Sequence, residues 1–158
     1  PVQLKRSKPH VVLLAHSIRS LWNVGSFFRT ADAMGVEKIY LTGYTAQPPR
    51  REISKTAIGA EEWIDWEYQK DPVEAINNLK SEGWSIVGLE LTDTAQKISE
   101  YEPSEKVCLV LGHEVTGVPE EIISLCDDIV YIPMHGKKES LNVSVAAGIA
   151  LNELQNRE

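Results

Sequence analysis

Short apolar runs alternate with segments of helical periodicity along the chain. Runs with the length and composition of strands lie at residues 10–15, 38–42, 84–89, 107–111 and 128–132, and residues 65–68 are a weaker candidate. Helical spacing or capping residues predict helices at 23–35, 72–82, 119–126 and 140–156, whereas 54–63 fits either a short helix or a loop. Alternating strands and helices predict an α/β fold with a mainly parallel sheet flanked by helices.

The first predicted helix has a one-sided apolar pattern. The residues that share its apolar face are Val24, Phe27, Phe28, Ala31 and Met34. Asn23 is the expected N-cap, and Gly25 leaves room for a ligand or another chain beside the first turn. Arg29 projects from the side opposite the apolar face. It is therefore not a core residue.

Two other helices show clear local signals. Asp71 is a good N-cap, and Pro72 follows it at the first helical position. The last helix carries an apolar stripe made of Leu141, Val145, Ile149 and Leu154. Such a stripe is more often part of a core, and it also fits an interface between subunits. Residues 43–51 and 92–106 read as loop or irregular segments.

Three loops that follow predicted strands hold unusual polar residues. Ligands of open α/β sheets bind beyond the carboxyl ends of the strands, so these loops are the expected place for a site. The loops are His16–Gly25, which leads to Arg29; Gly112–Pro119, in which two glycines flank Glu114; and Pro133–Ser144, which ends in Ser140, Asn142 and Ser144. No loop contains GxGxxG or GxxxxGK[ST], which argues against a Rossmann dinucleotide site and a P-loop.

Each of these residues also has a structural explanation. Arg29 can face an anionic substrate, or it can pair with Asp32 three residues on. Glu114 can accept hydrogen bonds from a sugar hydroxyl or an amide, or it can be the charged tip of a turn. Ser140 and Asn142 can contact a ligand, or they can simply cap the last helix.

Charge is distributed unevenly along the chain. The net charge is −7, but the first 60 residues hold nine basic and three acidic side chains, so their charge is +6 and the remainder carries −13. This asymmetry suggests a polyanionic partner for the basic part, unless folding mixes the two parts on one surface. Cys108 and Cys126 show no metal-binding spacing and are expected to be reduced thiols. No segment is long and apolar enough to span a bilayer.

In this order, the three loops resemble the signature motifs of the SpoU (TrmH-type) RNA ribose 2'-O-methyltransferases of the SPOUT superfamily. The first motif corresponds to Asn23-Val24-Gly25 with Arg29, and the second to Leu109–Glu114 with Gly117. The third corresponds to Ile132-Pro133-Met134 and to Ser140–Ala146. The similarity runs from about residue 10 to residue 154.

The resemblance implies a fold, a cofactor and an assembly. The family fold has a deep C-terminal trefoil knot, a feature that general folding rules would not suggest. S-adenosylmethionine binds in the knot, largely through backbone groups. In this chain, the corresponding donor-binding positions are Leu111, Gly112, Ile132, Met134 and Leu141. The family is dimeric, which implies a homodimer with a site completed across its interface.

The resemblance also implies the roles of single residues. Arg29 corresponds to the catalytic arginine, and Asn23, Glu114, Ser140 and Asn142 would orient substrate, arginine and loops. A guanidinium hardly loses its proton, so we favour electrostatic stabilisation by Arg29 over a role as general base. RNA, either tRNA or rRNA, is the implied substrate. The basic residues expected to contact it are Lys5, Arg6, Lys8, Arg50, Arg51 and Lys55.

Two other functions remain open from the sequence. One is a non-catalytic RNA-binding SPOUT relative, which would be expected to lack Arg29 or Asn142, although both are present. The other is a SPOUT enzyme that methylates a base instead of a ribose. We expect one methyltransferase domain over residues 1–158, without a separate N-terminal RNA-binding domain, in a cytoplasmic protein that does not enter a membrane.

Overall fold

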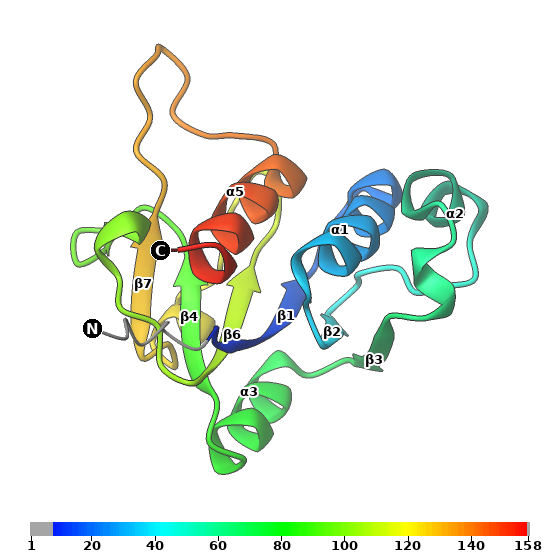
Figure 1. Ribbon diagram of the computed structural model, residues 1–158, viewed down its shortest axis with the longest axis horizontal. Coiled ribbons are helices and arrows are strands. Elements are labelled where there is room, and N and C mark those ends of the chain that lie inside the picture. Colours follow the sequence, from blue (N-terminus) through cyan, green and yellow to red (C-terminus); the bar gives the residue numbers. More distant parts are fainter. Residues whose placement is uncertain (1–7, 158) are drawn as a thin grey trace, which may run out of the picture.

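A seven-stranded, entirely parallel sheet forms the centre of the computed structural model, which describes residues 8–157 (Figure 1). The strand order is β3-β2-β1-β6-β4-β7-β5. The strands are β1 (His10–His16), β2 (Lys38–Thr42), β3 (Asp65–Gln69), β4 (Ser85–Leu89), β5 (Gln96–Lys97), β6 (Lys106–Leu111) and β7 (Asp128–Tyr131). The predicted parallel α/β sheet is confirmed. Within residues 92–106, predicted to be irregular, the structure adds β5 and the 3₁₀ turn Ile98–Glu100.

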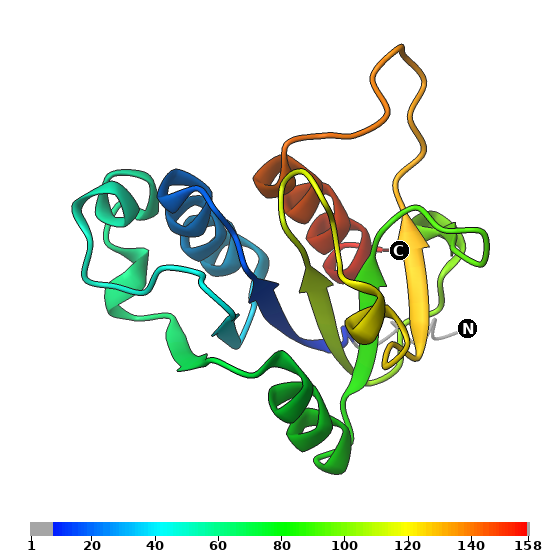
Figure 2. The same cartoon turned by 180° about the vertical axis from the view of Figure 1, so that it is seen from behind.

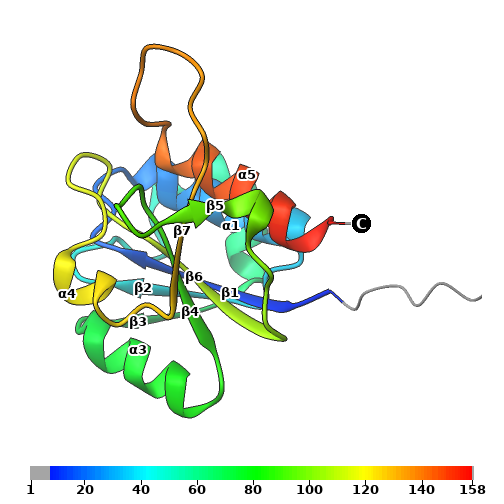
Figure 3. The same ribbon diagram turned by 90° about the vertical axis from the view of Figure 1, so that its left-hand side faces the viewer.

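Alternation along the central strands produces two apolar layers. On β1, Val11, Leu13 and Ala15 belong to one buried cluster, and Val12 and Leu14 belong to the other. Successive side chains of a strand point to opposite faces, so both faces need a cover of helices. The first cluster includes residues of α1 (Leu21–Met34), α2 (Arg51–Ala57) and α5 (Val143–Gln155). The second includes residues of α3 (Pro72–Ser81) and α4 (Glu120–Ile123), which lie across the sheet from α1 and α5 (Figure 3).

The starts of two helices differ from the sequence prediction. Ser20, not Asn23, is the N-cap of α1, because its side chain accepts a hydrogen bond from the Asn23 N–H at 3.2 Å. This frees the Asn23 side chain for a contact elsewhere. The last helix begins at Val143, because Asn142 caps it, so Ser140 and Leu141 lie in the preceding loop. Helix α4 is also shorter than predicted, whereas 54–63 forms the end of α2 and a 3₁₀ turn at Ala60–Glu62.

Gly25 is required by the packing of two helices. A Cβ atom at this position would lie 1.9 Å from Thr56 Oγ1 and 2.3 Å from the Ile53 carbonyl oxygen of α2. The open approach expected at Gly25 is therefore occupied by the chain itself, and no ligand enters there. Among residues 8–157, no helix is long and apolar enough to cross a membrane.

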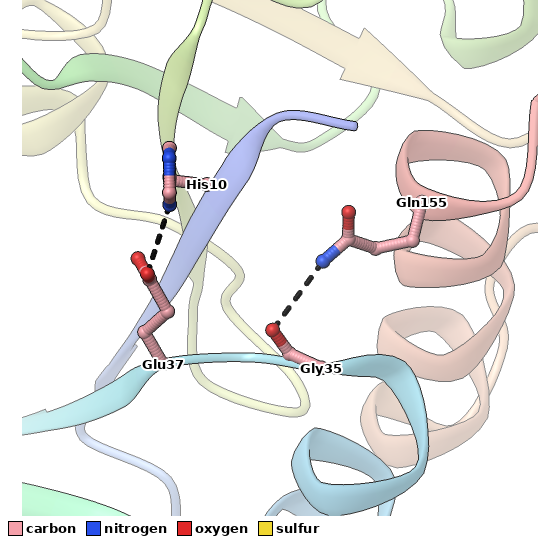
Figure 4. Close-up of polar contacts among 4 residues, drawn as sticks. All are labelled: His10, Gly35, Glu37 and Gln155. Carbon is pink, nitrogen blue, oxygen red and sulfur yellow. Dashed lines mark hydrogen bonds and ion pairs between the residues drawn. The ribbon is translucent and has the colours of Figure 1, made fainter. Parts of the chain in front are cut away.

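Two polar contacts tie the elements together at the amino end of the sheet (Figure 4). His10 Nδ1 lies 2.9 Å from Glu37 Oε1, and Gln155 Nε2 donates to the Gly35 carbonyl oxygen at 3.5 Å. Gly35 ends α1 in the left-handed conformation, with φ of 71°. These contacts link the start of β1 to the segment after α1, and the end of α5 to the end of α1.

Candidate functional site

A cavity of about 400 Å³ lies at the carboxyl ends of β4, β6 and β7. The loops at residues 112–119 and 132–142 rise from this end of the sheet (Figure 2). All five residues predicted to bind the methyl donor line the cavity: Leu111, Gly112, Ile132, Met134 and Leu141. Its volume falls within the usual range for a small-molecule site. Tertiary structure therefore brings together residues that the sequence places in two separate loops.

The loop after β6 forms one rigid wall of this cavity. His113 N donates to the Gly117 carbonyl oxygen at 3.1 Å, and Gly117 N donates to the His113 carbonyl oxygen at 2.9 Å. The His113 ring accepts at Nδ1 from the amides of Val115 and Thr116. A Cβ atom at Gly112 would lie 2.4 Å from the Gly117 carbonyl carbon and 2.5 Å from Val118 N. Only glycine fits at position 112 because backbone crosses directly over it.

Glu114 connects this loop to the start of α1. Its Oε1 accepts from Arg19 N at 2.8 Å, and its Oε2 accepts from Ser20 N at 2.8 Å and from Asn23 Nδ2 at 3.2 Å. From the sequence, either a sugar hydroxyl or an amide is expected as the hydrogen-bond donor to Glu114. In the structure, the donors are amides of the chain itself. Burial acts to raise the pKa of Glu114, but the hydrogen bonds from Arg19 and Ser20 outweigh it, and the pKa lies below its ordinary value.

Replacing Glu114 with glutamine should destabilise the fold in a pH-dependent way. The glutamine side chain keeps one acceptor oxygen, but its NH₂ group is a donor and would face a second donor, the backbone N–H of Arg19 or Ser20. We therefore expect the free energy of unfolding at pH 7 to fall by about 1–2 kcal/mol. Because the folded pKa is lowered, the contribution of wild-type Glu114 is complete above the ordinary value of about 4.3. It is lost as the pH falls through the folded pKa. Urea unfolding at pH 7 and pH 3 measures this; an equal difference at both pH values would contradict it.

The remaining catalytic candidates occupy different places. Ser140 lines the cavity in the loop before α5. Asn142 Oδ1 accepts from Ser144 N at 2.9 Å and from Ser144 Oγ at 2.6 Å, so in this chain its amide oxygen caps α5. Asn23 touches Glu114, so it reaches the cavity only through that side chain.

Arg29 is exposed on α1 and does not line the cavity. The pair with Asp32 is absent: Asp32 Oδ1 instead accepts from Trp63 Nε1 at 2.9 Å. Within residues 8–157, the Arg29 guanidinium has neither an ion pair nor a hydrogen bond. Its charge is therefore available to a group outside this chain.

Glu90 is a cavity residue that sequence reasoning missed. It follows Leu89 at the end of β4 and lines the same cavity. The strand-end rule that selected the other loops applies equally to this one. The signal was therefore available, but Glu90 stands in no recognised motif.

The basic residues expected to contact RNA fall into separate groups. Arg50, Arg51 and Lys55 are exposed at α2, and Lys55 Nζ lies 5.8 Å from the centre of the Trp22 ring, which is 48% exposed. Lys8 is exposed before β1, at the amino end of the sheet. Lys5 and Arg6 lie outside the described residues.

Comparison with known proteins gives consistent matches over nearly the whole chain. The model of the SpoU rRNA Methylase family matches residues 10–152. The chain is 30% identical over 154 residues to the tRNA (guanosine(18)-2'-O)-methyltransferase of Escherichia coli K12, covering 98% of the chain and 66% of that protein. It is 34% identical over 153 residues to the 23S rRNA (guanosine-2'-O-)-methyltransferase RlmB of Acinetobacter baylyi, covering 96% of the chain and 62% of that protein. The chain thus spans slightly less than two thirds of both relatives.

A solved structure agrees with the fold. The AdoMet-bound rRNA methyltransferase of Sinorhizobium meliloti superposes with a TM-score of 0.87 at 27% identity, over 94% of this chain and 56% of that one. The expected fold class, a parallel α/β sheet of the SpoU type with its C-terminal knot, is confirmed.

Proposed function

The chain belongs to the SpoU rRNA methylase family, and from this premise we propose that it transfers a methyl group from S-adenosylmethionine to the 2'-hydroxyl of a ribose in tRNA or rRNA. One observation carries the proposal: all five residues that the family motifs assign to the donor line a single cavity. The glycine at position 112 and the apolar side chains of Leu111, Ile132 and Leu141 suit an adenine held by backbone and apolar contacts. S-adenosylmethionine therefore fits the site.

The donor, when bound, supplies an electrophilic methyl group on a sulfonium. The chain's own residues would hold the acceptor ribose in line with it, and positioning alone can supply much of the rate. Arg29 stabilises the developing negative charge on the 2'-oxygen and binds a neighbouring phosphate with its planar guanidinium. Glu114 and Asn23 fix the start of the helix that carries Arg29. Ser140 and Asn142 would orient the loop before α5 and the substrate beside it.

Transfer of a labelled methyl group to RNA tests this function. The purified protein, S-adenosylmethionine and unmodified tRNA or rRNA transcripts should give RNA whose methylated position resists alkali, because alkaline cleavage requires a free 2'-hydroxyl. Methylation that leaves the RNA alkali-labile would indicate a base methyltransferase. Donor binding without transfer to any transcript would favour the non-catalytic RNA-binding alternative.

We also propose that the protein acts as a homodimer. Leu141, Val145 and Ile149 are 37%, 50% and 38% exposed, so most of the apolar stripe faces solvent and only Leu154 enters the core. An exposed apolar patch of this kind favours an interface. Val145 and Ile149 lie on α5, which packs against α1, the helix that carries Arg29 (Figure 1). Because Leu141 belongs to both the stripe and the cavity, a partner on this face would lie beside the cavity, and we propose that the partner's Arg29 completes the site.

Placing a charge in the stripe should separate the subunits. We expect wild type to sediment as a dimer at micromolar concentration and Val145→Asp/Ile149→Asp to sediment as a monomer, because burying two unpaired carboxylates is costly. Methyl transfer by this double variant should also fall, because it no longer forms the dimer. As a control, Asn77→Asp/Asn78→Asp adds two charges at exposed positions of α3, which lies across the sheet from α5, and it should remain dimeric. A monomeric wild type would refute the proposal.

RNA contacts are proposed for the basic residues at α2 and at the N-terminus: Lys5, Arg6, Lys8, Arg50, Arg51 and Lys55. The exposed Trp22 beside Lys55 adds an aromatic surface next to the cations of α2. Aromatic rings and cations together suit nucleotides, because bases stack and phosphates pair with the charge.

A further inference from the structure

Glu90 lies where the cavity loops converge. Strand β4 is hydrogen-bonded to β6 on one side and to β7 on the other. The Glu90 amide continues this pairing by donating to the Val130 carbonyl oxygen at 2.9 Å. Its side chain therefore starts between the loop that begins at Gly112 and the loop that begins at Ile132. Both loops line the cavity.

One oxygen of this carboxylate is held in place by the wall of the cavity. Glu90 Oε2 accepts from Val118 N at 2.8 Å. Gly117 has φ of 73°, and a Cβ atom there would lie 2.0 Å from Oε2. The carboxylate thus packs directly on the backbone, whereas Oε1 accepts no hydrogen bond from any residue of 8–157. The side chain is fixed but keeps one free acceptor.

Glu90 differs from the other acidic residues of this cavity. Both oxygens of Glu114 are taken by Arg19, Ser20 and Asn23. Glu120 and Glu139 are exposed at the rim. Among the described carboxylates that line the cavity, only Glu90 combines partial burial, a fixed position and a free oxygen.

We infer that Glu90 binds the methyl donor by accepting a hydrogen bond from a hydroxyl of its ribose. The inference rests on the proposed function and adds a side-chain contact to a site expected to use mainly backbone. A hydroxyl has one donor, which matches the single free oxygen. The ammonium group of the methyl donor has three N–H donors. The neighbouring Leu89, Leu111 and Ile132 offer no side-chain acceptor, so two of these N–H groups would remain unpaired. A carboxylate at a strand end that binds a ribose hydroxyl is an arrangement known from nucleotide-binding α/β folds.

Calorimetric titration with donor analogues tests the contact. The ligands are S-adenosylhomocysteine and its 2'-deoxy and 3'-deoxy forms, and the proteins are wild type, Glu90→Gln and Glu90→Ala. We expect wild type to bind at least one deoxy form about 10- to 100-fold more weakly, the range for losing a hydrogen bond to a charged group. In Glu90→Ala this penalty should shrink to about twofold or less, because no side-chain partner for the hydroxyl remains. Glu90→Gln can keep the Val118 bond through its amide oxygen, and its penalty should be smaller than that of wild type because the hydrogen bond no longer involves a charged group. Glu120→Gln, a matched change at the rim, should keep the full penalty.

The outcomes separate this contact from its alternatives. If Glu90 only anchored the loop, the penalty for the deoxy forms would be the same in wild type and in both variants, whatever their overall affinity, and the inference would be overturned. If it bound the ammonium, the loss in Glu90→Gln would vanish with 5'-methylthioadenosine, which keeps the ribose but lacks the amino acid. That result also overturns the inference. Failure of wild type to bind S-adenosylhomocysteine at all would instead overturn the proposed function. Circular dichroism melting identifies any variant that does not fold.

Discussion

Arg29→Ala is expected to abolish most methyl transfer while leaving donor binding nearly intact. Losing one preorganised donor at a developing charge typically costs roughly a hundred- to a thousandfold in rate. The guanidinium is exposed, has no partner among residues 8–157 and does not line the donor cavity. Its removal should therefore cost little folding stability and little donor affinity. Single-turnover transfer of labelled methyl to RNA measures the first effect, and titration with S-adenosylmethionine measures the second.

Two further variants test whether the guanidinium of Arg29 itself is required. Arg29→Lys should recover little activity, because an ammonium cannot reproduce a planar fork that contacts phosphate and 2'-oxygen together. Asp32→Asn, which alters a neighbouring charge bound to Trp63, should keep near-normal turnover. Near-normal transfer by Arg29→Ala would show that the match to the first motif does not report the mechanism.

Gly112→Val is expected to eliminate donor binding. Its Cβ atom would meet the Gly117 carbonyl group and Val118 N at 2.4–2.5 Å, and backbone cannot turn aside as a flexible side chain does. The loop over residues 112–118 must shift, and overpacking of this kind costs roughly 1–3 kcal/mol. The melting temperature should fall by about 2–4 °C for each kcal/mol. No heat of donor binding should be detected at concentrations that saturate wild type.

Gly136 supplies the matched control. It lies in the loop before α5, and a Cβ atom there would meet nothing within 4 Å. Gly136→Ala should therefore bind S-adenosylmethionine as wild type does. If Gly112→Val bound the donor normally, the cavity at the ends of β4, β6 and β7 would not be the donor site.

The amino-acid sequence by itself determined most of the elements of this fold, and its resemblance to the SpoU family identified the residues proposed to bind the donor. Alternating and helical apolar patterns are local, so they identified six of the seven strands and the core face of α1 from a few neighbouring residues. The motif residues at Leu111, Gly112, Ile132, Met134 and Leu141 were also identified, and they meet at one cavity. The positions themselves came from the resemblance to the family motifs, because strand ends indicate only which loops can hold a site.

Tertiary structure decided how the polar residues are used. Glu114 binds Arg19 N, 95 residues away, and Glu90 binds Val118 N, 28 residues away. Strand order brings these groups together, and no local pattern encodes strand order. The same reason explains why Asn23 contacts Glu114 while Ser20 caps α1, and why most of the α5 stripe is exposed. A periodic stripe shows that one face of a helix is apolar, but only packing decides whether that face meets the sheet, solvent or a second subunit.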